Sequence, residues 1–222
     1  MANIRTMTLA DLAECGDLNP EYARIAKRIL VDSYDDFIDT FYDDIDQCVI
    51  EIERNRELRQ ESGEDLISVD IVSMLKVIGY NATHDAKTGG HVDLTVHHAK
   101  GYEWLGEAKI HSTYDYLYEG FLQLCTRYST GSPTSSCGGI LAYIKTHDAS
   151  SVMANWRATL HEKGLPSYED WDCEKRMGLS FFSRHTHDVS GMPYTVRHMA
   201  IMLSHSPRDR SARSSKKGKI SK

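Results

Sequence analysis

Hydrophobic and polar residues along this chain follow two different periods. The first sixty residues mainly show the helical period. In the acidic stretch that begins at Tyr34, four apolar residues share one face of a helix: Phe37, Phe41, Ile45 and Val49. Asn19 followed by Pro20 is typical of the start of a helix. Residues 8–60 are therefore predicted to be helical, with a strongly acidic outer face.

Beyond residue 60 the helical and strand periods alternate. Helical spacing occurs in three segments: 63–78, 114–128 and 150–163. Runs rich in β-branched and aromatic residues predict strands in 80–86, the two arms of 89–110, 138–146, 177–184 and 194–203. The order α-β-β-β-α-β-α-β-β predicts an α/β fold, a mixed β-sheet flanked by helices, with an N-terminal helical extension.

The segment GGHVDLTVHHAKGYEWLGEAKI (residues 89–110) is predicted to be a β-hairpin. Its turn is centred on Lys100, and Gly101 supplies the left-handed residue that a three-residue loop needs. With this centre, one face carries only apolar pairs and glycine: Val92 with Ala108, Leu94 with Gly106, and Val96 with Trp104. The other face carries the polar pairs: His91 with Lys109, Asp93 with Glu107, Thr95 with Leu105, and His97 with Glu103.

This register sets two carboxylates, Asp93 and Glu107, opposite each other. Facing Cβ atoms in an antiparallel pair lie about 4.5–5.5 Å apart, and like charges at that distance are destabilising. Three arrangements would relieve the repulsion: one acid is protonated, Lys109 and His91 neutralise the pair, or a divalent cation binds between the carboxylates. A cation held by two carboxylates and water suits Mg²⁺. With Lys109 beside it, such a centre favours hydrolysis of phosphodiesters by a metal-activated water.

The same residues resemble a known signature. Asp93, a spacer of thirteen residues and then Glu107-Ala108-Lys109 are similar to the motif of the PD-(D/E)XK nuclease superfamily. The predicted α-β-β-β-α-β order over roughly residues 61–145 also resembles the core of these restriction-endonuclease-like enzymes. The resemblance implies that Asp93, Glu107 and the backbone carbonyl of Ala108 bind Mg²⁺, with Mn²⁺ as a substitute. It also implies that Lys109 serves the attacking water.

The resemblance implies two accessory residues. Many members add an acid from the helix before the first strand, which Glu64 matches as a further metal ligand, with two competitors nearby, Asp65 and Glu61. Some members add a glutamine on the following helix, which Gln123 matches as a positioning residue. The related Q-x-x-x-Y pattern is not met, because Tyr128 falls one residue late, so the exonuclease branch that carries it is not assigned. Val92 stands where the motif's name has proline.

Composition restricts the class of protein. A chain of 222 residues with 41% hydrophobic residues can bury one sizeable core. The five cysteines are scattered and form no C-x-x-C pair, which suits a reducing cytosol and excludes a zinc ribbon. No apolar run is long enough for a membrane span, and the N-terminus lacks an apolar signal core. We expect a cytoplasmic protein with no membrane partner.

Five histidines surround the predicted hairpin: His84, His91, His97, His98 and His111. Because no H-E-x-x-H motif and no nearby cysteine accompany them, they are interpreted as surface or hydrogen-bonded histidines rather than zinc ligands. His91, opposite Lys109 in the predicted register, is the one expected to contact a phosphate. Arg127 lies on a polar stripe of its helix and is a second candidate for contact with nucleic acid.

Charge is distributed unevenly along the chain. The net charge is −6, but residues 207–222 contain seven Lys/Arg and one Asp, which is +6 and leaves −12 on residues 1–206. Residues 206–222 lack apolar periodicity and are predicted to form a disordered basic tail, in which Lys216 and Lys217 are candidates for backbone contact with nucleic acid. The chain is thus divided into an acidic helical region (1–60), a nuclease-like core (61–205) and the tail.

These patterns favour one function and leave alternatives open. The first is a Mg²⁺-dependent nuclease that hydrolyses DNA phosphodiester bonds, in restriction, phage defence or DNA processing. The alternative is a non-catalytic nucleic-acid-binding or assembly subunit with a nuclease-like fold, suggested by the acidic body. A third is a phosphoesterase acting on small nucleotides. The sequence does not separate DNA from RNA. A homodimer would let one centre per chain cut both strands, and a protein partner would supply DNA targeting or activation.

Overall fold

The computed structural model describes residues 7–16, 19–87 and 90–209. The tail candidates Lys216 and Lys217 and the start of the predicted hairpin at Gly89 lie outside these residues. Within them the helices are α1 (Leu9–Glu14), α2 (Pro20–Leu30), α3 (Tyr34–Arg54), α4 (Glu64–Val77), α5 (Tyr114–Leu122) and α6 (Ala149–Glu162). Two short 3₁₀ turns, η2 (Arg56–Leu58) and η4 (Glu174–Arg176), and a π-helical segment, η3 (Gln123–Tyr128), complete them.

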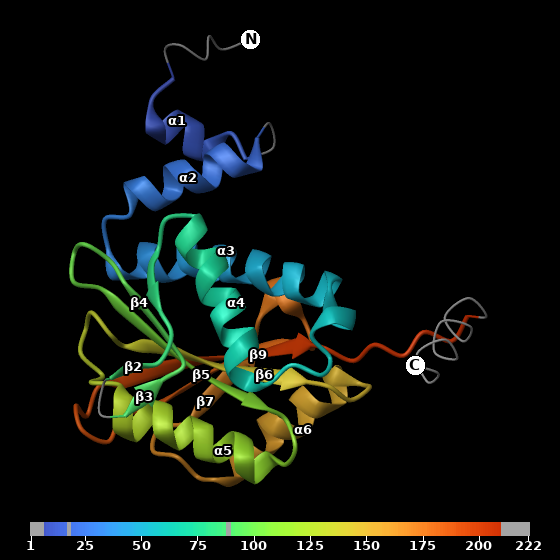
Figure 1. The fold of residues 1–222 in the computed structure, drawn as a ribbon. Coiled ribbons are helices and arrows are strands. Elements are labelled where there is room, and N and C mark those ends of the chain that lie inside the picture. The colour runs from blue at the N-terminus through green and yellow to red at the C-terminus, as the bar shows by residue number, and fades with distance from the viewer. Residues whose placement is uncertain (1–6, 17–18, 88–89, 210–222) are drawn as a thin grey trace.

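A mixed seven-stranded sheet forms the centre of the fold (Figure 1). Its strands, in spatial order, are β1 (Asn81–Thr83), β4 (Leu94–His97), β5 (Glu103–Ile110), β6 (Cys137–Ile144), β9 (Pro193–Met202), β8 (Ser180–Thr186) and β7 (Glu169–Asp172). β6 runs parallel to both β5 and β9, and the other neighbours are antiparallel. Two further strands, β2 (Ala86–Lys87) and β3 (His91–Val92), form a small separate hairpin. The predicted α/β fold with a mixed sheet flanked by helices is confirmed.

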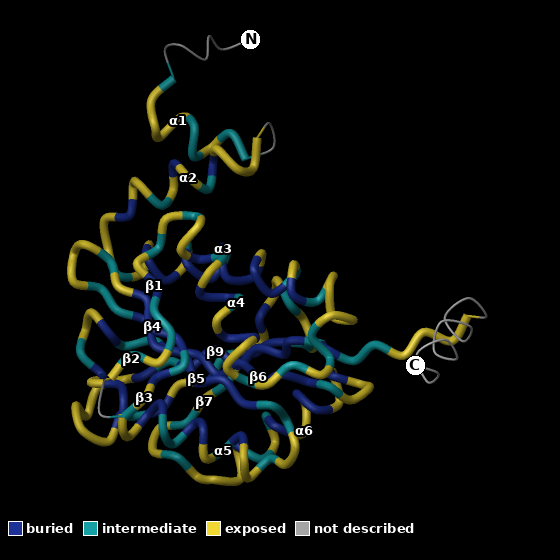
Figure 2. Tube along the Cα trace, in the orientation of Figure 1, coloured by how far each residue is buried: buried dark blue, intermediate teal, exposed yellow. Residues whose placement is uncertain are grey.

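Helices cover both faces of the sheet and create two hydrophobic cores (Figures 1 and 2). The first core joins α3 and α4 to one face and contains Phe41, Ile71 and Trp104. The second joins α5 and α6 to the other face and contains Phe121 and Trp156. The buried positions in Figure 2 follow the central strands and the helix sides that face them. None of the helices in the described part of the chain combines the length and apolar character needed to cross a bilayer.

Helix α3 carries the predicted apolar face and buries it on the sheet. Phe37, Phe41, Ile45 and Val49 are all buried in the first core. A buried ion pair adds a second link, because both carboxylate oxygens of Asp46 accept hydrogen bonds from Arg197 Nη2 on β9, at 2.9 and 2.8 Å. The guanidinium of Arg197 also lies 4.8 Å from the centre of the Tyr42 ring. The long N-terminal helix is therefore attached to the sheet by both packing and charge.

The predicted hairpin register is confirmed between β4 and β5. Leu94 pairs with Gly106 and Val96 pairs with Trp104, as a turn centred on Lys100 requires. Gly101 adopts φ +80°, and its N–H donates to the carbonyl of His98 at 2.9 Å. This left-handed conformation is the reason that a glycine follows Lys100.

The predicted register is wrong beyond Leu94. Strand β4 begins there, so Asp93 lies outside the ladder and Val92 pairs with Ala86 in the β2–β3 hairpin instead of with Ala108. Val92 is buried in the second core, on the opposite side from Leu94. The physical reason is a side-chain acceptor: Asp93 Oδ2 takes the N–H of Ala108 at 2.8 Å. The main chain of Asp93 forms no ladder pair with β5 and bends away from this strand.

Candidate metal-binding and catalytic site

The motif residues of β5 point toward α5 and are deeply buried. Glu107 is 2% exposed and Lys109 is 8% exposed. Lys109 Nζ lies 2.5 Å from Glu107 Oε1. A Cβ at Gly120 of α5 would lie 2.8 Å from Lys109 Cγ and 3.4 Å from Glu107 Cγ. Glycine at position 120 therefore lets the helix approach these two side chains closely.

Asp93 reaches the same region from the break between β3 and β4. One of its carboxylate oxygens accepts the Ala108 N–H, which fixes the side chain against β5. Within residues 7–16, 19–87 and 90–209, Oδ1 has no hydrogen-bond partner and is open to a ligand. The backbone carbonyl of Ala108 as a metal ligand stays a prediction.

Glu64 and Asp65 come from the first turn of α4. Glu64 Oε2 accepts a hydrogen bond from the N–H of Ile110 at 2.6 Å, and its Oε1 lies 3.7 Å from Lys109 Nζ. Glu64 is therefore held on the end of β5 beside the lysine. Its neighbour Asp65 is exposed and belongs to a different group of side chains.

Asp65, His84 and Asp93 form a group whose ligand atoms all lie within 4.8 Å of one another. His84 lies at the bend between β1 and β2, and its buried Nε2 has no hydrogen-bond partner. The interpretation of the histidines as surface or hydrogen-bonded residues is wrong for this ring nitrogen. Sequence reasoning missed His84 because neither its position nor its neighbours follow a metal-ligand motif.

Burial and mutual repulsion change the acidity of these groups. Burial, followed by the charge of Asp93, raises the pKa of Glu107 to about 7, although Lys109 opposes this shift. Burial also raises the pKa values of Asp93 and Glu64. For Lys109, burial lowers the pKa, but the hydrogen bond and charge of Glu107 outweigh it and the net change is upward. Three acids thus share one ammonium, an arrangement that favours an additional cation.

The nucleic-acid candidates lie at different places. His91 is exposed and its Nδ1 lies 2.5 Å from Asp85 Oδ1, so its predicted position opposite Lys109 is wrong. The reason is again the break at Asp93, which pairs His91 with Lys87. Arg127 is exposed on η3, and its Cδ lies 3.1 Å from where a Cβ at Gly90 would be.

Gln123 begins the π-helical segment η3. Its side-chain oxygen is buried and has no hydrogen-bond partner. Residues five apart share a face in a π-helix, because its hydrogen bonds join i to i+5. Gln123 and Tyr128 therefore lie on one side of η3. The wider turn accommodates the one residue by which their spacing exceeds that of the Q-x-x-x-Y pattern. Tyr128 is buried, and after burial itself, the charge of Glu107 is the next cause that raises its pKa.

Two buried histidines of the C-terminal region, His187 and His198, have hydrogen-bond partners, whereas Nδ1 of the buried His185 has none. His187 Nδ1 lies within reach of the backbone N–H groups of Val189 and Ser190, so it accepts, and Nε2 donates to Ser129 Oγ at 2.9 Å. His198 Nδ1 accepts from Trp156 Nε1 at 3.1 Å. Both rings are fully buried, and burial lowers the pKa of His198 to about 3. His198 also packs against Phe181, with 4.4 Å between ring centres, beside the second core.

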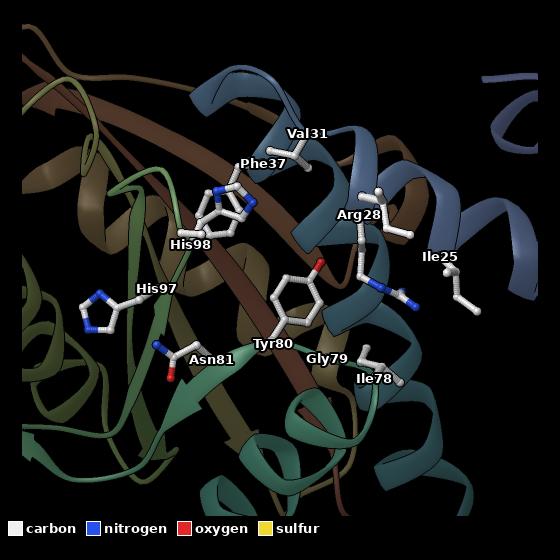
Figure 3. A pocket seen from close by; sticks show the side chains of 12 residues that line it. Ile25, Arg28, Val31, Phe37, Ile78, Gly79, Tyr80, Asn81, His97 and His98 are labelled. Carbon is white, nitrogen blue, oxygen red and sulfur yellow. The ribbon is translucent and has the colours of Figure 1, made fainter. Parts of the chain in front are cut away.

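A cavity of about 450 Å³ lies away from these acids, between α2, the start of α3 and strands β1 and β4 (Figure 3). Its lining includes Ile25, Val31 and Phe37, with His98 packed 5.6 Å from Phe37 between ring centres. Arg28 also lines it and binds the buried Asp44 at 2.8 Å. Its mainly apolar lining brings together no group of acids.

No family model matches this chain, and comparisons with curated proteins and with solved structures return no match either. The geometry of the site formed by Glu64, Asp93, Glu107 and Lys109 is therefore the basis on which a function is proposed.

Proposed function

We propose that this chain is a divalent-metal-dependent nuclease that hydrolyses DNA phosphodiester bonds and belongs to the PD-(D/E)XK superfamily, with a restriction-endonuclease-like fold. One observation carries the proposal. Asp93, Glu107 and Glu64 come from three separate segments and surround a single buried lysine, Lys109. Packing alone does not favour such a group, because it buries Glu107 and half-buries Glu64 and Asp93 around one ammonium, which costs free energy.

The donor set fits a divalent cation. Glu107 Oε2 is buried without a hydrogen-bond partner, and Oδ1 of Asp93 accepts no hydrogen bond from the described residues. Asp93 and Asp65, whose ligand atoms lie within 4.8 Å of each other, would hold the ion, Mg²⁺ or Mn²⁺, with Asp65 in the accessory position that the sequence had assigned to Glu64. Glu107 would join them if its unpartnered Oε2 turned toward Asp93. When bound, the ion would polarise a phosphoryl oxygen and lower the pKa of a coordinated water.

The chain's own residues have separate tasks in this proposal. Lys109 supplies a fixed positive charge that orients the attacking water and stabilises the negative charge that develops on the phosphoryl group. Glu64, bonded to the Ile110 N–H and 3.7 Å from Lys109 Nζ, positions that ammonium. Gln123, with an unpartnered buried oxygen one turn beyond Gly120, is placed to hold substrate or water. Arg127, Lys216 and Lys217 would contact the nucleic-acid backbone.

The test is cleavage of plasmid and linear DNA, with an RNA arm, by purified protein in Mg²⁺ or Mn²⁺. We expect Glu107→Ala and Lys109→Ala to lower the cleavage rate by at least about 100-fold, because each removes a group that acts on the transition state. Glu119→Ala, on the exposed side of α5, is the matched control and should cleave like the wild type. Equal cleavage by all four proteins would rule out this centre.

A non-catalytic binding or assembly subunit is the second candidate. The observation that favours it is the −12 charge of residues 1–206, which opposes nucleic acid unless a partner supplies a basic surface. Metal-independent DNA binding with no cleavage in any divalent ion would support this candidate over the first. The elution volume at increasing protein concentration would test the homodimer that cutting both strands would require.

A further inference from the structure

His84 is the one nitrogen donor in the group that it forms with Asp65 and Asp93. The imidazole is half-buried, and its Nε2 has no solvent contact and no hydrogen-bond partner. A buried polar atom without a hydrogen-bond partner lowers folding stability by about 1–3 kcal/mol, so such atoms are uncommon in native proteins. A metal ion bound at this nitrogen would be the partner that it lacks.

We infer that this site selects a divalent transition-metal ion such as Mn²⁺ over Mg²⁺, because His84 supplies a nitrogen ligand beside the carboxylates of Asp65 and Asp93. This inference rests on the proposed metal-dependent function and names the ion that serves it.

The distances permit such a centre after a small adjustment. Ligands at about 2.1 Å from one metal ion are about 3.0 Å apart when adjacent and about 4.2 Å apart when opposite, and the three ligand atoms lie within 4.8 Å of one another. Asp65 is exposed in the first turn of α4, so its carboxylate can turn toward the ion. Asp93 is already held by the Ala108 N–H and would not need to move.

Glu107 is a further acid of this region, outside the group of three ligand atoms. Glu107 is 2% exposed and its Oε2 is buried without a partner. After burial, the charge of Asp93 is the next cause that raises the pKa of Glu107, so the two carboxylates repel each other. On the side of β5, Lys109 binds Oε1 of Glu107 and leaves Oε2 without a partner.

The donor types decide which ion is preferred. Mg²⁺ binds oxygen in near-ideal octahedral geometry and keeps much of its water, so an imidazole contributes little to holding it. First-row transition ions accept imidazole nitrogen readily and bind mixed nitrogen and oxygen sites more tightly. A site with two carboxylates and one imidazole should therefore discriminate against Mg²⁺, although both ions are divalent.

The test uses Mn²⁺ as the probe and measures binding without substrate. Titration followed by the electron paramagnetic resonance signal of free Mn²⁺ gives its affinity, and competition with Mg²⁺ gives the selectivity. Spin-echo modulation of bound Mn²⁺ should contain a nitrogen coupling in the wild type and lose it in His84→Asp. That variant replaces nitrogen by oxygen, and we expect it to reduce the preference for Mn²⁺ by at least about tenfold.

His111→Ala is the matched control. His111 is also half-buried with an unpartnered Nε2, but its ring packs at a tilt against Tyr114, 5.2 Å between ring centres, and it lies outside the group of ligands. This variant should keep the nitrogen coupling and the Mn²⁺ affinity. Mn²⁺ bound to the wild type without nitrogen coupling, or unchanged selectivity in His84→Asp, would overturn the inference.

The outcomes also separate this inference from the proposed nuclease. A wild type that binds Mn²⁺ through nitrogen but cuts no nucleic acid contradicts the nuclease and leaves the metal site intact. A wild type that cuts DNA equally well with Mg²⁺ and has no nitrogen coupling supports the nuclease and contradicts the role of His84.

Discussion

Lys109 is the counter-ion of the candidate site when no metal is bound. The sequence left three ways to relieve the repulsion between Asp93 and Glu107. In the structure Lys109 binds Glu107 directly, whereas His91 binds Asp85 and takes no part. Burial and Asp93 still raise the pKa of Glu107 to about 7, so a large share of this carboxyl is protonated near neutral pH. One ammonium is not sufficient for these acids.

The first prediction concerns the pH dependence of stability in metal-free protein. Because the folded pKa of Glu107 is raised from 4.5 to about 7, the stability contributed by its protonated form is lost as the pH rises between these values. Glu107→Gln does not titrate there. Between about pH 5 and about pH 8, the free energy of unfolding of Glu107→Gln should therefore rise by about 1–3 kcal/mol relative to that of the wild type. Urea denaturation in chelator at both pH values measures this gain.

Two features make that comparison specific. The pKa of Lys109 is raised above 10.5, so the lysine does not titrate in the same window. Glu119→Gln, on the exposed side of α5, serves as the control and should follow the wild type at both pH values. A difference between Glu107→Gln and wild type that stays constant with pH would mean that Glu107 is not destabilised by ionising.

Helices and strands were predictable where one period continued without interruption. The helical period located α3, α4 and α6, and the alternation of residues 94–106 predicted the β4–β5 register. The break at Asp93 was not predictable from the pattern, because the polar and apolar alternation continues through it. It depends on a contact between Asp93 and a backbone group fifteen positions away in the chain.

Three other elements depend on their surroundings in the same way. The strand expected over residues 80–86 is divided into β1 and β2 by the bend that contains His84. The edge strand β7 lacks an apolar run of its own and forms by pairing with β8. The helix expected over 114–128 becomes π-helical at Gln123, a change that places Tyr128 on the side of Gln123. The motif residues on β5 were therefore visible in the sequence, but the ligand group that includes His84 was not.

The second prediction tests the close approach of α5 to β5. Gly120→Ala places a Cβ 2.8 Å from Lys109 Cγ and 3.2 Å from Lys109 Cε, so the lysine side chain must move. Alanine also stabilises a helix by about 1 kcal/mol relative to glycine, which offsets part of the strain. We expect at least about a tenfold loss of cleavage with a change in unfolding free energy below about 2 kcal/mol.

The comparison for this variant is Gly16→Ala, whose Cβ would meet its nearest neighbour, Ala23, only at 4.0 Å. Cleavage rate and urea denaturation are measured on both proteins. Loss of cleavage in Gly120→Ala together with an unfolded or strongly destabilised protein would show a packing defect. Full activity would mean that the position of Lys109 does not limit the reaction.

The whole molecule is held together by contacts between segments far apart in the chain. The ladder from β5 through β6 to β9 joins residues 105–110 to residues 195–202, and α3 lies across the face that these strands share with α4 (Figure 1). The sequence predicted the acidic face of α3 but not its buried acids, Asp44 and Asp46. Asp46 is 6% exposed and its partner Arg197 is 1% exposed. Because the two are 151 residues apart, no local pattern relates them.

The last prediction follows from that pair. Arg197→Met should lower the free energy of unfolding by about 3–5 kcal/mol, because it leaves the Asp46 carboxylate buried without its counter-charge. Arg197→Met combined with Asp46→Leu should recover much of this loss, since neither charge is then buried. Arg184→Met, which breaks the exposed pair with Glu169, is the control and should cost no more than about 1 kcal/mol. Urea denaturation of these proteins and of the single variant Asp46→Leu completes the cycle and gives the coupling. An Arg197→Met cost as small as that of Arg184→Met would mean that packing alone holds α3 on the sheet.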